Sequence, residues 1–90
     1  MDDTKPIIKA TDMTDEMQEK VIDLACQLID RSGGNEKDVS TNLKINLDRN
    51  FNPTWHVVVG KNFGASVGFE KSTYLYFYTG PYAVLVWKIG

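Results

Sequence analysis

Pro53 divides this chain into two halves with different hydrophobic periods, and that change constrains the fold more than any other feature. Proline lacks an amide proton and disfavours the helical conformation in the residue before it, so a preceding helix ends there. The run of β-branched and aromatic residues over Thr54–Val59 follows at once and predicts a buried strand. We therefore expect helices before Pro53 and strands after it.

The first helix is predicted by apolar residues that recur with helical spacing. Asp12 or Thr14 can cap its N-terminus, and the glycine pair at 33–34 ends it. A short edge strand over residues 5–10 can precede it, because Pro6 is tolerated only at an edge or at the start of a strand. The apolar stripe consists of Met17, Val21, Leu24 and Leu28.

The second helix follows directly, with Asn35 as its predicted cap. Its apolar residues recur at every fourth position up to Pro53, which predicts one buried face. This stripe consists of Val39, Leu43, Leu47 and Phe51.

The second half of the chain alternates with the period of a strand. Phe63–Phe69, Thr73–Tyr78 and Tyr82–Ile89 each predict one strand, and Gly80-Pro81 predicts the turn between the last two. Short connections between strands imply an antiparallel sheet, so we expect one α+β domain over residues 1–90, with two N-terminal helices packed on that sheet.

The last two predicted strands are apolar on both faces. Ala83, Leu85 and Trp87 lie on one face of the last strand, opposite Val84 and Val86. Two helices cover only one face of a sheet, so the other face needs a different partner. A second copy of the chain across a two-fold interface is the economical solution.

Composition excludes several classes of protein. The chain has 42% hydrophobic and 24% charged residues, which is typical of a globular protein. A net charge of −2 argues against nucleic acid as the main partner, because binding phosphate needs clustered lysine and arginine. No apolar run is long enough to span a bilayer, and the polar N-terminus is unlike a secretory signal. We expect no membrane insertion.

His56 and Cys26 are the only histidine and the only cysteine. One of each, thirty residues apart, gives no ligand set for a metal, and we expect no metal and no cofactor. A lone cysteine fits a reducing compartment. A small enzyme that uses both residues remains an alternative, although Cys26 follows two apolar helical residues, as a small buried side chain does.

Alternating tyrosines over residues 74–78 allow another alternative, an RNA-binding sheet that stacks bases on aromatic rings. Such a platform needs surrounding arginine and lysine, and only Lys71 and Lys88 are close in the sequence. Tyrosines that line a core or a groove are the preferred interpretation.

The motif Asn-Pro-Thr-Trp-His at residues 52–56, followed by Gly60 and by Asn-Phe-Gly at 62–64, closely resembles the dynein light chain family of small dimeric hub proteins. The resemblance covers nearly the whole chain. Further matches are Lys5 to Lys9, Asp12-Met13, Glu16 to Gln18, Glu36 to Asp38, Tyr76 to Tyr78, Gly80 and Lys88 to Gly90.

The resemblance implies a non-catalytic homodimer in which one strand is exchanged between subunits. Its implied partners are the dynein intermediate chain and other proteins with short Thr-Gln-Thr-like motifs, in the cytoplasm and on microtubules, including axonemes. Each motif adds to the exchanged strand, in one of two grooves, and its glutamine caps the second helix. The implied groove residues are Lys9, Glu36, Lys37, Asn62, Phe63, Gly64, Ala65, Ser66, Val67, Gly68, Phe69, Tyr74, Tyr76, Tyr78, Ala83 and Leu85. The implied dimer interface consists of His56, Lys61, Phe63, Ser66 and Val67.

This chain also departs from the family pattern. Ser66, Gly68 and Phe69 stand where the family usually has tyrosine, threonine and histidine, which predicts an altered motif preference and a more apolar end of the groove. Other departures are the added residue at Gly33-Gly34, and the residues Pro81, Tyr82 and Ile89. We expect a divergent member of the family that keeps the fold.

Overall fold

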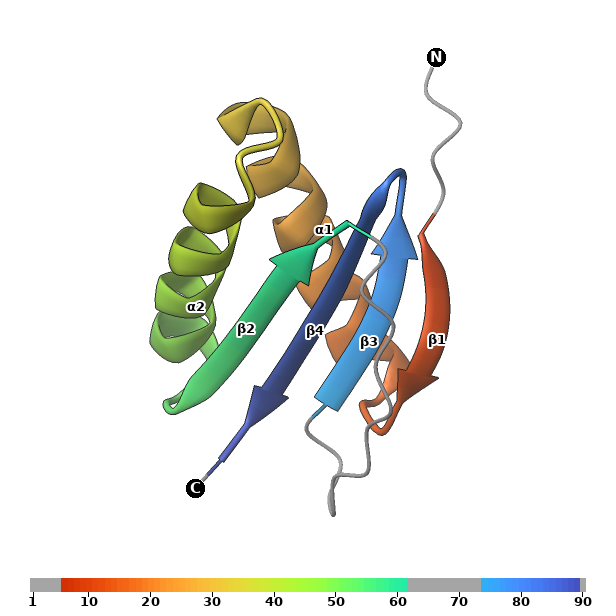
Figure 1. The fold of residues 1–90 in the computed structure, drawn as a ribbon. Helices are drawn as coiled ribbons and strands as arrows, with labels where there is room; N and C mark the ends of the chain where they lie inside the picture. The colour runs from red at the N-terminus through yellow and green to blue at the C-terminus, as the bar shows by residue number, and fades with distance from the viewer. Residues whose placement is uncertain (1–5, 62–73, 90) are drawn as a thin grey trace.

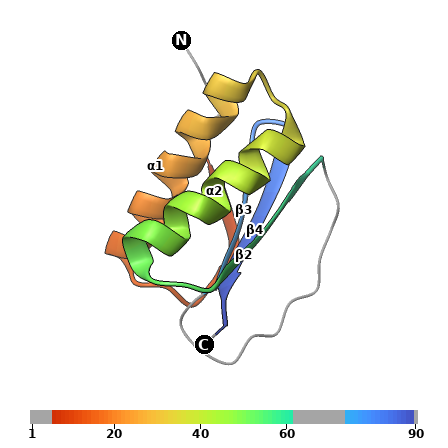
Figure 2. The same ribbon diagram turned by 90° about the vertical axis from the view of Figure 1, so that its left-hand side faces the viewer.

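The computed structural model describes residues 6–61 and 74–89 of the chain. They form a two-layer α+β fold in which both helices cover one face of an antiparallel sheet (Figures 1 and 2). The fold class is therefore confirmed, as are the short strand before the helices and the strands after Pro53. The elements are β1 (Ile7–Thr11), α1 (Asp15–Ser32), α2 (Glu36–Phe51), β2 (Trp55–Gly60), β3 (Tyr74–Thr79) and β4 (Tyr82–Lys88).

Helix α1 is capped at both ends. Thr14, and not Asp12, is the N-cap, and its hydroxyl accepts a hydrogen bond from the Met17 amide at 3.2 Å. Gly33 ends the helix in the left-handed conformation with φ of 66°, which glycine adopts without the penalty of a Cβ atom. The predicted apolar stripe faces the sheet, with Val21 fully buried.

Helix α2 has the predicted cap and the predicted buried face. The Asn35 side chain accepts a hydrogen bond from the Asp38 amide at 3.0 Å. Val39, Leu43 and Leu47 are buried, and the helix ends at Phe51, before Pro53.

The sheet has the strand order β1-β3-β4-β2, with every neighbouring pair antiparallel. The Gly80-Pro81 turn joins β3 to β4, and Thr79 lies opposite Tyr82, as the sequence predicted. Strand β1 takes the edge position that Pro6 indicated, and its register shifts between Ile8 and Ala10. The predicted strand Phe63–Phe69 lies outside the described residues.

Both faces of the sheet carry apolar side chains. On the helix side, the large side chains of Trp55, Leu75 and Phe77 are fully buried beneath α1 and α2. On the other side, no helix of the described part covers the sheet (Figure 2). A second cluster lies there and consists of Tyr76, Ala83 and Leu85, with Ala10, Tyr78 and Trp87 packed against them. The predicted alternation of faces in β3 and β4 is confirmed.

Candidate functional site

The first turn of α2 presents backbone amides that have no partner among residues 6–61 and 74–89. Asn35 satisfies two later donors, since its side chain accepts from the Asp38 amide and its carbonyl accepts from the Val39 amide at 3.0 Å. The amides of Glu36 and Lys37 donate no hydrogen bond within the described part of the chain. Such amides, at the positive end of a helix dipole, favour an acceptor from outside the helix.

Strand β2 is an edge of the described sheet. Trp55–Gly60 pairs with β4 on one side, and no strand of residues 6–61 or 74–89 pairs with it on the other. Trp55 is buried, Val58 is 41% exposed, and the other residues of the strand are half-buried. An edge strand of this kind is a template for adding another strand.

The start of α2 and the end of β2 lie at the same end of the molecule, because the two elements run in opposite directions (Figures 1 and 2). The β3–β4 turn lies at this end as well. The free amides of Glu36 and Lys37 are therefore placed near the end of the open strand edge.

His56 lies on the sheet face that carries no helix. Its ring stacks on Trp87 of β4, with centroids 5.3 Å apart and an angle of 22° between the planes. Cys26 projects from α1 on the helix side, where its thiol contacts the Thr79 hydroxyl at 3.7 Å. The two residues are thus on opposite sides of the sheet, and the described fold does not bring them together as a catalytic pair.

The predicted tyrosines share the face on which His56 lies. The Tyr76 and Tyr78 hydroxyls are 3.3 Å apart, and the Lys9 ammonium lies 5.4 Å from the centre of the Tyr78 ring. Tyr76 is only 5% exposed, so its ring is not open to base stacking. Ala83 and Leu85 complete the face, and both are buried.

The predicted groove residues therefore fall into two groups within one chain. Lys9, the tyrosines, Ala83 and Leu85 belong to the open sheet face, whereas Glu36 and Lys37 begin a helix that packs on the opposite face. A single chain does not bring these two groups together. The remaining predicted residues lie outside the described part, namely Asn62, Phe63, Gly64, Ala65, Ser66, Val67, Gly68 and Phe69.

Asp48 anchors β2 to α2, a contact that sequence patterns did not indicate. One carboxylate oxygen accepts from the Trp55 amide at 2.8 Å, and the other pairs with the Lys44 ammonium at 2.6 Å. These hydrogen bonds, that of Lys44 foremost, lower the pKa of Asp48 below its ordinary value of 3.8. The i, i+4 spacing of Lys44 and Asp48 could have predicted their ion pair, but the hydrogen bond to Trp55 depends on the fold.

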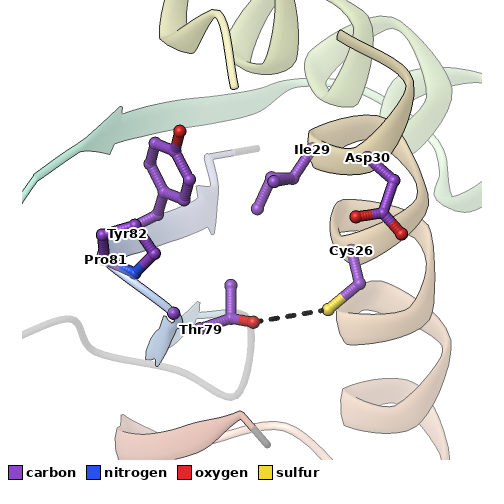
Figure 3. A pocket seen from close by; sticks show the side chains of 7 residues that line it. Cys26, Ile29, Asp30, Thr79, Pro81 and Tyr82 are labelled. Atoms are coloured by element: carbon purple, nitrogen blue, oxygen red, sulfur yellow. Dashed lines mark hydrogen bonds between the residues drawn. The ribbon is translucent and has the colours of Figure 1, made fainter. Parts of the chain in front are cut away.

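A pocket of about 220 Å³ lies between α1 and the β3–β4 turn (Figure 3). Cys26 and Asp30 line it from the helix, and Thr79 and Tyr82 line it from the strands. The hydrogen bond between Cys26 and Thr79 crosses its floor, and the Tyr82 hydroxyl is turned away from the thiol (Figure 3). This pocket was not predictable from sequence patterns, because Cys26 and Thr79, which line it, are 53 residues apart in the chain.

The described residues contain no group of three or more His, Cys, Asp or Glu side chains placed to hold a metal ion. Neither α1 nor α2, the helices of the described part, is long and apolar enough to cross a membrane.

Comparison with known proteins identifies the family. The model of the family "dynein light chain type 1" matches residues 5–89. The dynein light chain-like domain of the Fasciola hepatica calcium binding protein FhCaBP2 has a TM-score of 0.86 at 22% identity, covering 99% of this chain and 95% of that one. The DLC-like domain of CsTAL3 has a TM-score of 0.73 at 24% identity, covering 92% and 90%. These structures share the fold, and because the family model spans nearly the whole sequence, the chain belongs to the dynein light chain type 1 family.

Proposed function

We propose that the chain is a non-catalytic, homodimeric adaptor of a dynein motor complex, which binds short linear motifs of partner proteins by strand addition. One observation carries this proposal. The end of β2, whose outer edge has no partner strand in the described part, lies at the same end of the molecule as the Glu36 and Lys37 amides, which have no acceptor there. Membership of the dynein light chain family supports it. The site of action is the cytoplasm, in association with microtubules.

The dimer forms by exchange of the segment Phe63–Phe69, which pairs with the open edge of β2 in the other subunit. The second apolar face of the sheet supports this arrangement, since no described helix covers it. His56 and Lys61 belong to this interface, together with Phe63, Ser66 and Val67. Burial of the interface adds to the small core of a 90-residue chain.

The exchanged strand then receives the partner peptide on its remaining edge. Main-chain hydrogen bonds along Asn62–Val67 provide affinity, as in other cases of strand addition. The side-chain carbonyl of a motif glutamine accepts from the amides of Glu36 and Lys37, which have no acceptor in the described part of the chain. Peptides with a Thr-Gln-Thr-like motif, including that of the dynein intermediate chain, are the proposed ligands.

The other groove residues support this strand. Gly64 and Ala65 leave room for the backbone of the partner peptide. Gly68 and Phe69 determine which motif side chains are preferred at one end of the groove. The supporting face consists of Lys9, Tyr74, Tyr76, Tyr78, Ala83 and Leu85. Two grooves in one dimer hold two partner chains side by side. When the partner is itself a dimer, binding of its first motif raises the effective concentration of its second motif at the other groove.

A peptide titration followed by backbone NMR tests the proposal. A Thr-Gln-Thr-like peptide is expected to shift the amides of Glu36 and Lys37 and those of residues 62–67. The matched control peptide has alanine in place of the glutamine, and it is expected to leave the Glu36 and Lys37 shifts nearly unchanged. Shifts confined to other parts of the chain, or no binding of either peptide, contradict the proposal.

A further inference from the structure

Tyr82 connects the last strand to the loop between the two helices. Its hydroxyl donates a hydrogen bond to the Gly34 carbonyl at 3.2 Å. The contact is close, since a Cβ atom on Gly34 would lie 2.2 Å from the Tyr82 oxygen. The two residues are 48 positions apart in the sequence, so this hydrogen bond joins β4 to the loop between α1 and α2.

The loop contains two residues with unusual backbone freedom. Gly33 and Gly34 adopt φ values of 66° and 88°, in the left-handed region that glycine enters without a steric penalty. Glycine equally allows many other conformations, so two in succession leave the direction of the next helix loosely determined. Specific hydrogen bonds are therefore needed to fix where α2 begins.

The peptide group between Gly34 and Asn35 is held from both sides. Its carbonyl accepts from Tyr82, and its N–H donates to the Ser32 carbonyl at 3.4 Å. This peptide group directly precedes the N-cap Asn35, so it lies next to the first turn of α2, which contains the amides of Glu36 and Lys37. The Tyr82 hydrogen bond thus acts one residue before the cap.

Lys61 extends the same connection to β2. Its ammonium lies 5.8 Å from the centre of the Tyr82 ring, within the range of a cation–π interaction. Tyr82 therefore contacts the loop before α2 through its hydroxyl and the residue after β2 through its ring. Tyr82 thus adds a direct link between the helix start and the end of the open strand edge, beside the core packing that holds α2 on the sheet.

We propose that Tyr82 is a positioning residue for motif recognition, which holds the first turn of α2 so that its free amides meet the motif glutamine. The inference rests on the proposed function, because it assumes that the glutamine caps α2. Tyr82 touches no peptide. It acts by restricting the conformation of the Gly33-Gly34 loop before binding. This reduces the conformational entropy that the loop would otherwise lose when the peptide binds.

The test combines a hydroxyl deletion with the two peptides, one with glutamine and one with alanine in its place. Tyr82→Phe is expected to weaken binding of the glutamine peptide about 3- to 10-fold, the effect of losing one neutral hydrogen bond. It is expected to change binding of the alanine peptide less than about twofold. The control is Ser40→Ala, which removes a hydroxyl that donates to the Lys37 carbonyl on the exposed side of α2, and which leaves both affinities unchanged.

Hydrogen exchange in the free protein provides a second readout. Tyr82→Phe is expected to accelerate exchange of the Asp38 and Val39 amides, which depend on the Asn35 cap, and to spare the Met17 and Gln18 amides at the start of α1. Equal weakening of both peptides, or unchanged affinity and exchange, overturns the role of Tyr82. Failure of the wild-type protein to distinguish the two peptides overturns the proposed glutamine cap itself.

Discussion

At the scale of single residues, Asp48 shows how one side chain joins two elements. Its carboxylate accepts from the first amide of β2 and from Lys44 within α2, so the strand starts at a defined point along the helix. Both contacts favour the ionised form and lower the pKa of Asp48. A folded-state pKa below the unfolded value means that ionised Asp48 stabilises the fold.

Replacing Asp48 by asparagine is therefore expected to lower the urea midpoint at neutral pH. The difference from wild type is expected to shrink as pH falls below the ordinary carboxyl value of 3.8, because the unfolded chain then binds a proton that the folded chain takes up only at its lower pKa. Urea unfolding at pH 7 and at pH 3 measures both effects. Asp23→Asn, at an exposed position on α1, is the control with the same change of charge. A constant difference at both pH values contradicts this role.

At the scale of the elements, α2 is held to the sheet by one apolar stripe. Leu47 is fully buried in this stripe, whereas Ile45 on the same helix is 47% exposed. Leu47→Ala is expected to reduce the free energy of unfolding by about 2–5 kcal/mol, through lost transfer energy and the cavity that remains. Ile45→Ala removes an apolar side chain of equal size and is expected to cost less than about 1 kcal/mol. Similar losses for the two variants, measured by urea unfolding, would contradict the observed packing.

The elements themselves were predictable because their signals are local. The stripes ending at Leu28 and Phe51, the cap at Asn35 and the turn at Gly80-Pro81 all depend on neighbouring residues, and the structure confirms them. The strand order was not predictable, since the pairing of β1 with β3 joins segments more than sixty residues apart without a sequence period. The bond from Tyr82 to Gly34 was missed for the same reason. The groove residues of β3 and β4 lie on the faces that their alternation predicted, whereas those at 62–69 lie outside the described part. The groove itself remains a prediction because it requires a second chain.

At the scale of the whole molecule, the fold leaves one apolar sheet face and one strand edge without a partner in the described part. The proposed dimer covers both. His56 lies on this face, stacked on Trp87, so a charge at this position would be buried in the proposed interface.

His56→Lys is expected to weaken the dimer about tenfold or more, because two ammonium groups would be desolvated close together. Ile45→Lys adds the same charge on an exposed helical face and serves as the control. Sedimentation equilibrium measures the association. An unchanged dimer constant in His56→Lys would place His56 outside the interface.

Sedimentation velocity with a labelled Thr-Gln-Thr-like peptide tests the proposed peptide-binding dimer, because it reports assembly and binding together. We expect one species of about twice the chain mass of 10.2 kDa that carries two peptides. Dissociation at low protein concentration is expected to release the peptide, since each groove needs both subunits. Peptide that sediments with a species of single-chain mass, or that does not sediment with the protein at all, would contradict this proposal.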